Sequence, residues 1–259
     1  MSSSGRARAV QFRDLVRELT RKELKVRYRN SFLGYVWSVA SPAAQALVYF
    51  FAFKVVVRIA VDNYGLFLIA GLFVWQWFIN SLTVCTGVFL MNASLIKKVA
   101  FPRQALPLAS VLNDCLHFLL SLPVIAVVAA LYGVFPRLSW SYGLPILVFL
   151  QFLLVLGFGL LVSSINLFFR DLERLVTILL SIVFYATPII YPLDMVPSRF
   201  RPLVFLNPMT PLVVNYRSVL LDGVLQWRYV GLSLVYGLVW LGLGWCIFAR
   251  LRWRFAEAL

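Results

Sequence analysis

The sequence contains very few side chains that could perform catalysis. Its single histidine, His117, follows Asp114 by three residues in an apolar stretch, so both side chains would share one face of a helix. That spacing suits a pair of side chains that form hydrogen bonds to a neighbouring helix. A proton relay would need more carboxylates than Asp114 alone. The phosphate-binding motif GxxxxGK[ST] and the zinc motif HExxH are both absent. We therefore expect no catalytic residue, no metal site and no cofactor on this chain.

The three cysteines offer no further chemistry. Cys85, Cys115 and Cys246 all stand in apolar surroundings, and their spacing matches neither a disulfide framework nor a zinc site. We expect them to be inert residues packed among apolar neighbours.

The elements that carry these residues belong in a membrane. Of the 259 residues, 62% are hydrophobic and only 13% are charged, against about 25% charged residues in ordinary soluble domains. This balance excludes a soluble enzyme, a disordered chain and a secreted disulfide scaffold. The net charge of +14 would suggest nucleic acid in a soluble protein. Here the basic residues cluster at the edges of apolar runs, which indicates membrane orientation and no nucleic-acid partner.

Six stretches are long enough to cross a bilayer, which takes about 20 apolar residues. They predict an all-α membrane protein with six transmembrane helices, within Phe32–Phe53, Asn63–Ile96, Cys115–Pro136, Leu138–Phe169, Leu175–Leu193 and Tyr229–Ala249.

A seventh apolar run, Pro202–Tyr216, is too short to span and is interrupted by prolines. Such a segment is tolerated at membrane depth only against protein or a water-filled cavity. We expect short re-entrant helices between spans five and six, with Thr210 as an N-cap before Pro211. If the chain forms a channel, these helices would close its outer mouth as a gate that includes Phe205, Asn207, Pro208 and Pro211.

The distribution of positive charge fixes the orientation. With both termini in the cytoplasm, the inner segments hold 17 of the 24 Lys and Arg residues and the outer segments hold 6. The excess of basic residues belongs on the cytoplasmic side. We therefore expect both termini to be cytoplasmic.

The N-terminal stretch predicts a helix that lies in the membrane interface. Phe12, Leu15, Val16 and Leu19 recur at helical spacing, and basic residues occupy much of the remaining surface. This helix would bind anionic membrane lipid, contact a cytoplasmic partner, or do both. The expected division is a cytoplasmic interface helix at 1–31, a transmembrane domain at 32–250 with an outer gate segment at 193–228, and a basic cytoplasmic tail at 251–259.

Two further features suit a transporter. Aromatic residues in mid-span could line a channel along which sugar rings slide, and we single out Tyr49, Phe50, Phe184 and Tyr185. The links Asn92–Leu106 and Arg170–Arg174 mix charged with apolar residues, as short docking helices do. Both features have simpler explanations. The aromatic residues could pack against lipid or neighbouring helices, and the links could be solvated turns.

Four motifs resemble one family in the same order. RELTRKELKVRYRNSFLGYVWSVASP resembles the opening of the membrane subunits of type-2 ABC transporters that export polysaccharides, through Tyr28, Arg29, Ser31, Leu33, Gly34, Trp37 and Pro42. NASLIKKVAFPRQALPL and INLFFRDLERL resemble its two coupling loops. YATPIIYPLDMVP with LNPMTPLVVNYRSVLLDG resembles its re-entrant signature, through Pro188, Tyr191, Pro192, Asn207, Pro208, Pro211 and Arg217.

The resemblance implies a permease of the Wzm-like group, which exports O-antigen, capsule or teichoic acid. Two copies would form a channel, and two copies of a separate ATPase, which binds ATP and magnesium, would drive export of an undecaprenyl-diphosphate-linked polysaccharide across the inner membrane. It implies ATPase coupling through Asn92, Leu95, Lys97, Lys98, Phe101, Arg103, Arg170, Asp171, Glu173 and Arg174. Cations near the inner membrane face could receive the lipid diphosphate, namely Lys25, Arg27 and Arg29.

Other functions remain open at this point. A drug or lipid ABC exporter would lack aromatic residues facing its pore. An ion-coupled secondary carrier would show inverted repeats, which we do not find, and a scaffold protein would form no channel.

Overall fold

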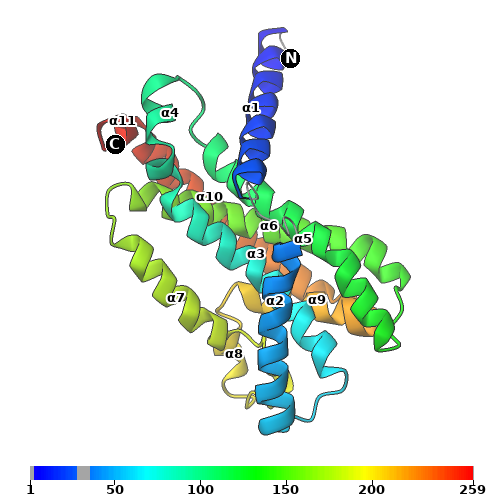
Figure 1. Cartoon of the computed structure of the whole chain (residues 1–259). Helices are drawn as coiled ribbons and strands as arrows, with labels where there is room; N and C mark the ends of the chain where they lie inside the picture. Colours follow the sequence, from blue (N-terminus) through cyan, green and yellow to red (C-terminus); the bar gives the residue numbers. More distant parts are fainter. Residues whose placement is uncertain (1–2, 28–35, 259) are drawn as a thin grey trace.

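The computed structural model describes residues 3–27 and 36–258, and helices are the only regular secondary structure in those ranges (Figure 1). The α-helices are α1 (Ser3–Arg27), α2 (Val36–Tyr49), α3 (Tyr64–Met91), α4 (Ala93–Lys98), α5 (Ala105–Leu131), α6 (Leu138–Asn166), α7 (Leu172–Ala186), α8 (Arg201–Val204), α9 (Met209–Arg217), α10 (Trp227–Leu251) and α11 (Phe255–Ala258). Four short segments join them: the π-helices η1 (Phe50–Val56) and η3 (Ser218–Asp222), and the 3₁₀ helices η2 (Leu193–Met195) and η4 (Arg252–Arg254). The all-α prediction is confirmed.

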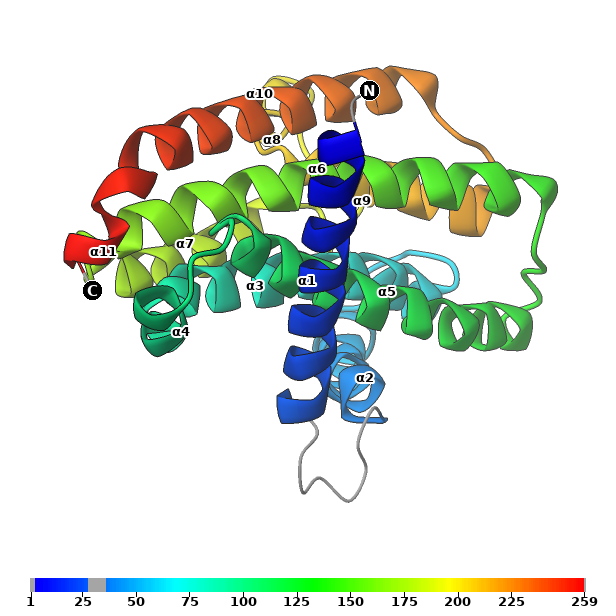
Figure 2. The ribbon, with the colours of Figure 1, turned by 90° about the horizontal axis from the view of Figure 1, so that it is seen from above.

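Four helices of the described residues are long and apolar enough to cross a membrane. They are α3, α5, α6 and the continuous stretch Trp227–Arg254 that begins with α10. They run side by side along a common direction (Figures 1 and 2), and they coincide with four of the six predicted spans. Interior prolines such as Pro123 and Pro145 are accommodated without ending the helix, as is common in membrane helices.

The helix α5 begins ten residues earlier than the predicted span. The sequence limit lay at Cys115 because Asp114 is charged, whereas the helix starts at Ala105 and buries Asp114. The Ser81 hydroxyl of α3 donates to the Asp114 carboxylate at 3.0 Å. A carboxylate inside the bundle is therefore compensated by hydrogen bonding.

The remaining two predicted spans correspond to shorter helices. The helix α2 continues through η1, and the residues directly before it lie outside the described ranges. The helix α7 has 15 residues, which extend about 22 Å. It ends at Ala186, well before the predicted limit at Leu193, because Thr187 precedes Pro188 and a residue before proline avoids the α conformation.

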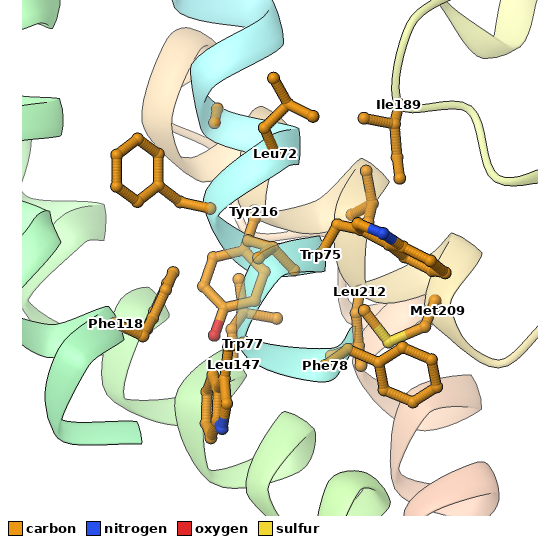
Figure 3. Close-up of a cluster of buried hydrophobic side chains, with 14 of the residues drawn as sticks. Leu72, Trp75, Trp77, Phe78, Phe118, Leu147, Ile189, Met209, Leu212 and Tyr216 are labelled. Atoms are coloured by element: carbon orange, nitrogen blue, oxygen red, sulfur yellow. The ribbon is translucent and has the colours of Figure 1, made fainter. Parts of the chain in front are cut away.

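The helix α3 is the centre of the main hydrophobic core. Its most apolar stretch is 67% buried, whereas that of α10 is only 22% buried. Side chains of α3 such as Trp75, Trp77 and Phe78 pack against α5, α6 and α9 (Figure 3). Two side-chain amides bind α6 to α3, since Gln151 donates to the Val74 carbonyl at 2.8 Å and Asn166 to the Thr86 carbonyl at 2.9 Å.

The helices α6 and α10 approach each other backbone to backbone. A Cβ atom added to Gly157 would collide with the main chain of Trp240 and Leu241, and one added to Gly244 would collide with the Gly157 carbonyl. Small residues at this crossing allow the close approach that stabilises membrane helix pairs.

The amphipathic helix α1 lies across the other helices rather than along them (Figure 2). Val16 and Leu19 are buried against a second core at one end of the bundle, while Arg17 and Arg21 are exposed. Two polar contacts attach α1 to the bundle: Lys22 Nζ donates to Asn92 Oδ1 at 3.1 Å, and the Ser110 hydroxyl donates to the Glu23 carboxylate at 2.8 Å. These contacts explain how the amphipathic helix is held in place.

Candidate coupling surface, channel wall and outer gate

The two predicted coupling links lie at the same end of the molecule. The helix α4, the start of α7 and the C-terminal α11 gather there (Figures 1 and 2). Asn92 fixes the corner between α3 and α4, because its amide donates to the Val88 carbonyl at 2.9 Å while its oxygen accepts from Lys22. We call the exposed residues of both links the coupling surface.

Six of the ten predicted coupling residues are exposed and four are partly buried. The exposed ones are all charged: Lys97, Lys98, Arg170, Asp171, Glu173 and Arg174. The partly buried ones are Asn92, Leu95, Phe101 and Arg103.

Phe101 and Arg103 therefore position their link as well as border the surface. Phe101 packs against the second core. The guanidinium of Arg103 donates to the Arg252 carbonyl and lies 5.8 Å from the centroid of the Phe255 ring.

Two apolar residues at this end were missed by the sequence analysis. Phe169 is 70% exposed and directly precedes Arg170, and Val99 is 50% exposed directly after α4. Apolar side chains next to charged docking loops were visible in the sequence, but only the structure shows which of them point outward. Exposed apolar residues of this kind are suited to a protein partner.

The predicted channel aromatics join a larger aromatic row. Tyr49 of α2 stacks on Phe184 of α7 with ring centroids 5.6 Å apart, and Phe184 also contacts Trp75 of α3 at 5.6 Å. Phe50 lies 6.2 Å from Tyr64. Rings from α2, α3 and α7 are thus in contact, and Phe50 forms a separate pair with Tyr64.

Tyr185 is the exposed member of this group. It neighbours Phe184 at 5.1 Å between centroids, and 62% of its surface is exposed. The Tyr191 hydroxyl donates to the Tyr185 carbonyl at 3.1 Å. This hydrogen bond joins the segment after α7 to the last turn of that helix.

The gate segment is bound to its surroundings by side-chain hydrogen bonds. Asn207 donates to the Thr187 hydroxyl at 2.6 Å and accepts from the Met209 amide at 3.0 Å. Phe205 stacks on Tyr229 of α10 at 5.2 Å, and its carbonyl accepts from the Tyr236 hydroxyl at 2.7 Å. The segment is therefore an ordered part of the fold.

The helix starts in this segment differ from the prediction. Pro208 occupies the N-cap of α9, and Pro211 is buried within the first turn of that helix. Thr210 is not the N-cap, because it lies within α9 and its hydroxyl donates back to the Val204 carbonyl at 2.7 Å. The Asn207 side chain already binds an amide of the first turn, which leaves that role filled.

Arg217 at the end of α9 is one of the six basic residues that the charge distribution assigns to the outer segments, and the structure shows that it is buried. Its Nε donates to the Phe67 carbonyl at 3.0 Å, and its two terminal nitrogens donate to the carbonyls of Pro188 and Ile189. The guanidinium carbon lies 3.5 Å from the centroid of the Phe67 ring. One cation thus connects α9, α3 and the segment after α7.

Two of the three predicted diphosphate-binding cations fall at the end of α1. Lys25 is exposed and Arg27 is the last residue of the helix. Arg29 lies outside the described residues.

Sequence comparison gives this arrangement a family context. Residues 14–221 match the ABC-2 type transporter family. The chain is 43% identical over 246 residues to the O-antigen export system permease protein RfbA of Klebsiella pneumoniae, which covers 95% of each chain. It is 37% identical over 212 residues to RfbA of Myxococcus xanthus, covering 81% of each chain. The polysialic acid transport protein KpsM of Escherichia coli is 21% identical over 223 residues, 85% of each chain.

Proposed function

Because this chain belongs to the ABC-2 type transporter family, we propose that it is the membrane subunit of an ATP-driven exporter that carries an O-antigen polysaccharide, linked to undecaprenyl diphosphate, across the inner membrane. One observation supports this proposal above all: 43% identity across 95% of the chain to a permease that exports O-antigen. The chain is a multi-pass inner-membrane protein, in keeping with its apolar helices and its family.

We propose six transmembrane passages with both termini in the cytoplasm. The α2–η1 unit and α7 would add two passages to the four long helices. The positive charges of the first link, the second link and residues 250–254 support a cytoplasmic location for that end of the molecule. In this arrangement residues 1–31, 32–250 and 251–259 form the interface helix, the membrane domain and the cytoplasmic tail, with 193–228 as the outer gate segment.

ATP hydrolysis would take place on a separate subunit, present in two copies. The absence of a phosphate-binding loop from the sequence supports this division of labour. ATP and its magnesium ion would bind that subunit. The purified chain alone should neither bind nor hydrolyse ATP, and measurable hydrolysis by a highly purified sample would contradict this assignment.

The ATPase would dock on the coupling surface. Its exposed charges and the apolar side chains of Val99 and Phe169 offer the mixture of an apolar anchor and a polar rim that protein interfaces use.

A second copy of this chain would complete the channel. The helix α7 buries only the stripe formed by Val176, Leu180 and Phe184. Five of its other apolar residues are exposed: Leu175, Ile178, Leu179, Ile182 and Tyr185. Since α7 is shorter than the bilayer core, covering it with protein would relieve the mismatch. A homodimer across this face would place the exposed ring of Tyr185 beside the polysaccharide. The partly buried rings of Tyr49 and Phe50 would lie near it, and the buried ring of Phe184 would support them.

The other two candidate sites would lie at opposite ends of the proposed channel. Lys25, with Arg27 and Arg29, would attract the lipid diphosphate on the cytoplasmic side, because charge-assisted bonds to phosphate are strong. The gate segment, with Phe205, Asn207, Pro208 and Pro211, would close the outer mouth between transport cycles.

A second candidate substrate is a capsular polysaccharide. The similarity to KpsM, a polysialic acid transport protein, favours it, although at a lower identity of 21%.

The decisive experiment is depletion of this chain in its host. We expect lipopolysaccharide to lose its O-antigen ladder while the lipid-linked polysaccharide accumulates on the cytoplasmic side of the inner membrane. Loss of capsule with a normal ladder would instead support the second candidate. In inverted vesicles, export should require ATP and should withstand an ionophore that collapses ion gradients. Sensitivity to the ionophore without an ATP requirement would overturn the ABC assignment.

A further inference from the structure

The C-terminal segment after α10 is anchored in the protein interior. Phe255, the first residue of α11, is fully buried, whereas Trp253 two residues earlier is 75% exposed. The expectation of a basic cytoplasmic tail at 251–259 accounts for the exposed residue but not for the buried one. The buried ring therefore needs an explanation of its own.

The Phe255 ring lies in an aromatic cluster drawn from α3, α10 and the residues after α6. Its centroid is 4.7 Å from that of Phe89, 5.7 Å from that of Phe248 and 6.3 Å from that of Phe168. Phe89 is near the end of α3, shortly before the first link, and Phe168 lies two residues after α6, shortly before the second link. The Phe255 ring thus contacts residues that lie shortly before each of the two links.

The first link also reaches this segment from its far end. Arg103 donates to the Arg252 carbonyl and places its guanidinium 5.8 Å from the Phe255 centroid. Ile96 of α4 is buried in the same core, and Phe101 packs against it. The link is therefore held both where it begins and where it ends.

We propose that Phe255 is a positioning residue that fixes the two links relative to each other, so that a movement of the ATPase reaches both links and α10 together. This role rests on the proposed function. Without the ring, Phe89 and Phe168 would lose their common packing partner, because a void removes the contacts on one side of each neighbour. The two links could then move independently.

The first test measures geometry and needs no ATPase. Spin labels at Lys97→Cys and Arg174→Cys, one on each link, would be introduced after replacement of the three natural cysteines. We expect one narrow distance distribution in the parent chain, a broadened one in Phe255→Ala, and an unchanged one in the control Trp253→Ala. An unchanged distribution in Phe255→Ala would overturn the positioning role, whatever the transported substrate.

The second test measures coupling in the assembled transporter. Phe255→Ala should still associate with the ATPase and hydrolyse ATP, but polysaccharide exported per ATP should fall about five- to tenfold, within the usual range of coupling between sites. Trp253→Ala should match the parent. A normal ratio of export to hydrolysis would contradict the proposal. If Phe255→Ala does not accumulate in the membrane, Phe255→Leu, which keeps apolar volume but removes the ring, allows the same two measurements.

Discussion

The guanidinium of Arg217 both covers the ring of Phe67, at 3.5 Å from its centroid, and donates to the carbonyl of the same residue at 3.0 Å. The same group donates to the carbonyls of Pro188 and Ile189. A buried cation is costly unless its donors are satisfied, and here main-chain oxygens and an aromatic face meet that need. The segment after α7 is thereby tied to the start of α3.

Removing this cation should loosen the outer half of the molecule. We expect Arg217→Ala to lower the free energy of unfolding by at least about 2 kcal/mol, because several charge-assisted hydrogen bonds are lost at once. Arg217→Lys should be nearly as damaging, since a point ammonium cannot reach three divergent acceptors as a planar guanidinium does. Thermal unfolding in detergent measures both, with exposed Arg199→Ala as the control. Stability equal to that of the parent would show that these bonds contribute little.

The coupling surface should respond differently to apolar and charged substitutions. Phe169→Ala should weaken association with the ATPase about tenfold without lowering stability, because the ring is exposed and suited to an interface anchor. Lys97→Ala should have a small effect, since exposed ion pairs contribute little. Co-purification with the ATPase at graded salt measures both.

Phe101→Ala separates docking from packing. This ring is partly buried against the second core, so its loss should lower stability by roughly 1–2 kcal/mol and uncouple export as well. If export and ATPase association stayed at the parental level in both phenylalanine variants, the docking assignment would be wrong.

Cysteine accessibility should distinguish the two parts of the gate segment. In a variant without natural cysteines, Leu206→Cys should react with a membrane-impermeant reagent at rest, because Leu206 is 70% exposed. Leu212→Cys should be protected, because Leu212 is fully buried, and should become reactive while a polysaccharide is being translocated. Rapid labelling of both positions in both states would indicate an ordinary exposed loop.

The crossing of α6 and α10 should tolerate no added methyl group. We expect Gly157→Ala to destabilise the protein by about 1–3 kcal/mol, the usual cost of overpacking, because the new Cβ would meet the main chain of α10. Gly242→Ala is the matched control, since nothing lies within 4 Å of its added Cβ. Unfolding free energies that fall equally for both variants would contradict the close approach.

Much of the membrane fold could be predicted from the sequence. The positions of α3, α6 and α10 follow from uninterrupted apolar runs, and the amphipathic α1 follows from its stripe of apolar residues. The predicted start of α5 was ten residues too late, because a rule that ends spans at charged residues treats Asp114 as a boundary. The structure compensates that carboxylate with the hydroxyl of Ser81, a contact between helices that sequence periodicity does not reveal.

The candidate sites were predictable as segments more than as individual contacts. The charged residues of the links and the prolines of the gate segment identify these segments, because their effects depend only on neighbouring residues in the sequence. The burial of Arg217 and the exposure of Phe169 depend on which residues meet from distant parts of the chain. Thr210 shows the same limit, because the N-terminus of α9 is satisfied by Asn207 from outside the helix.

The contrast in burial between α3 and α10 also bears on how such permeases diverge. A position on α3 must suit neighbouring side chains of fixed shape, so that an exchange that changes side-chain volume there requires matching changes elsewhere. Where the exposed side of α10 faces lipid, a position must only be apolar, since lipid tails adapt to any contour. Substitutions can therefore accumulate on α10 with little loss of stability, while the sequence of α3 should change more slowly. Two exporters that share few residues along α10 could still share one architecture around α3.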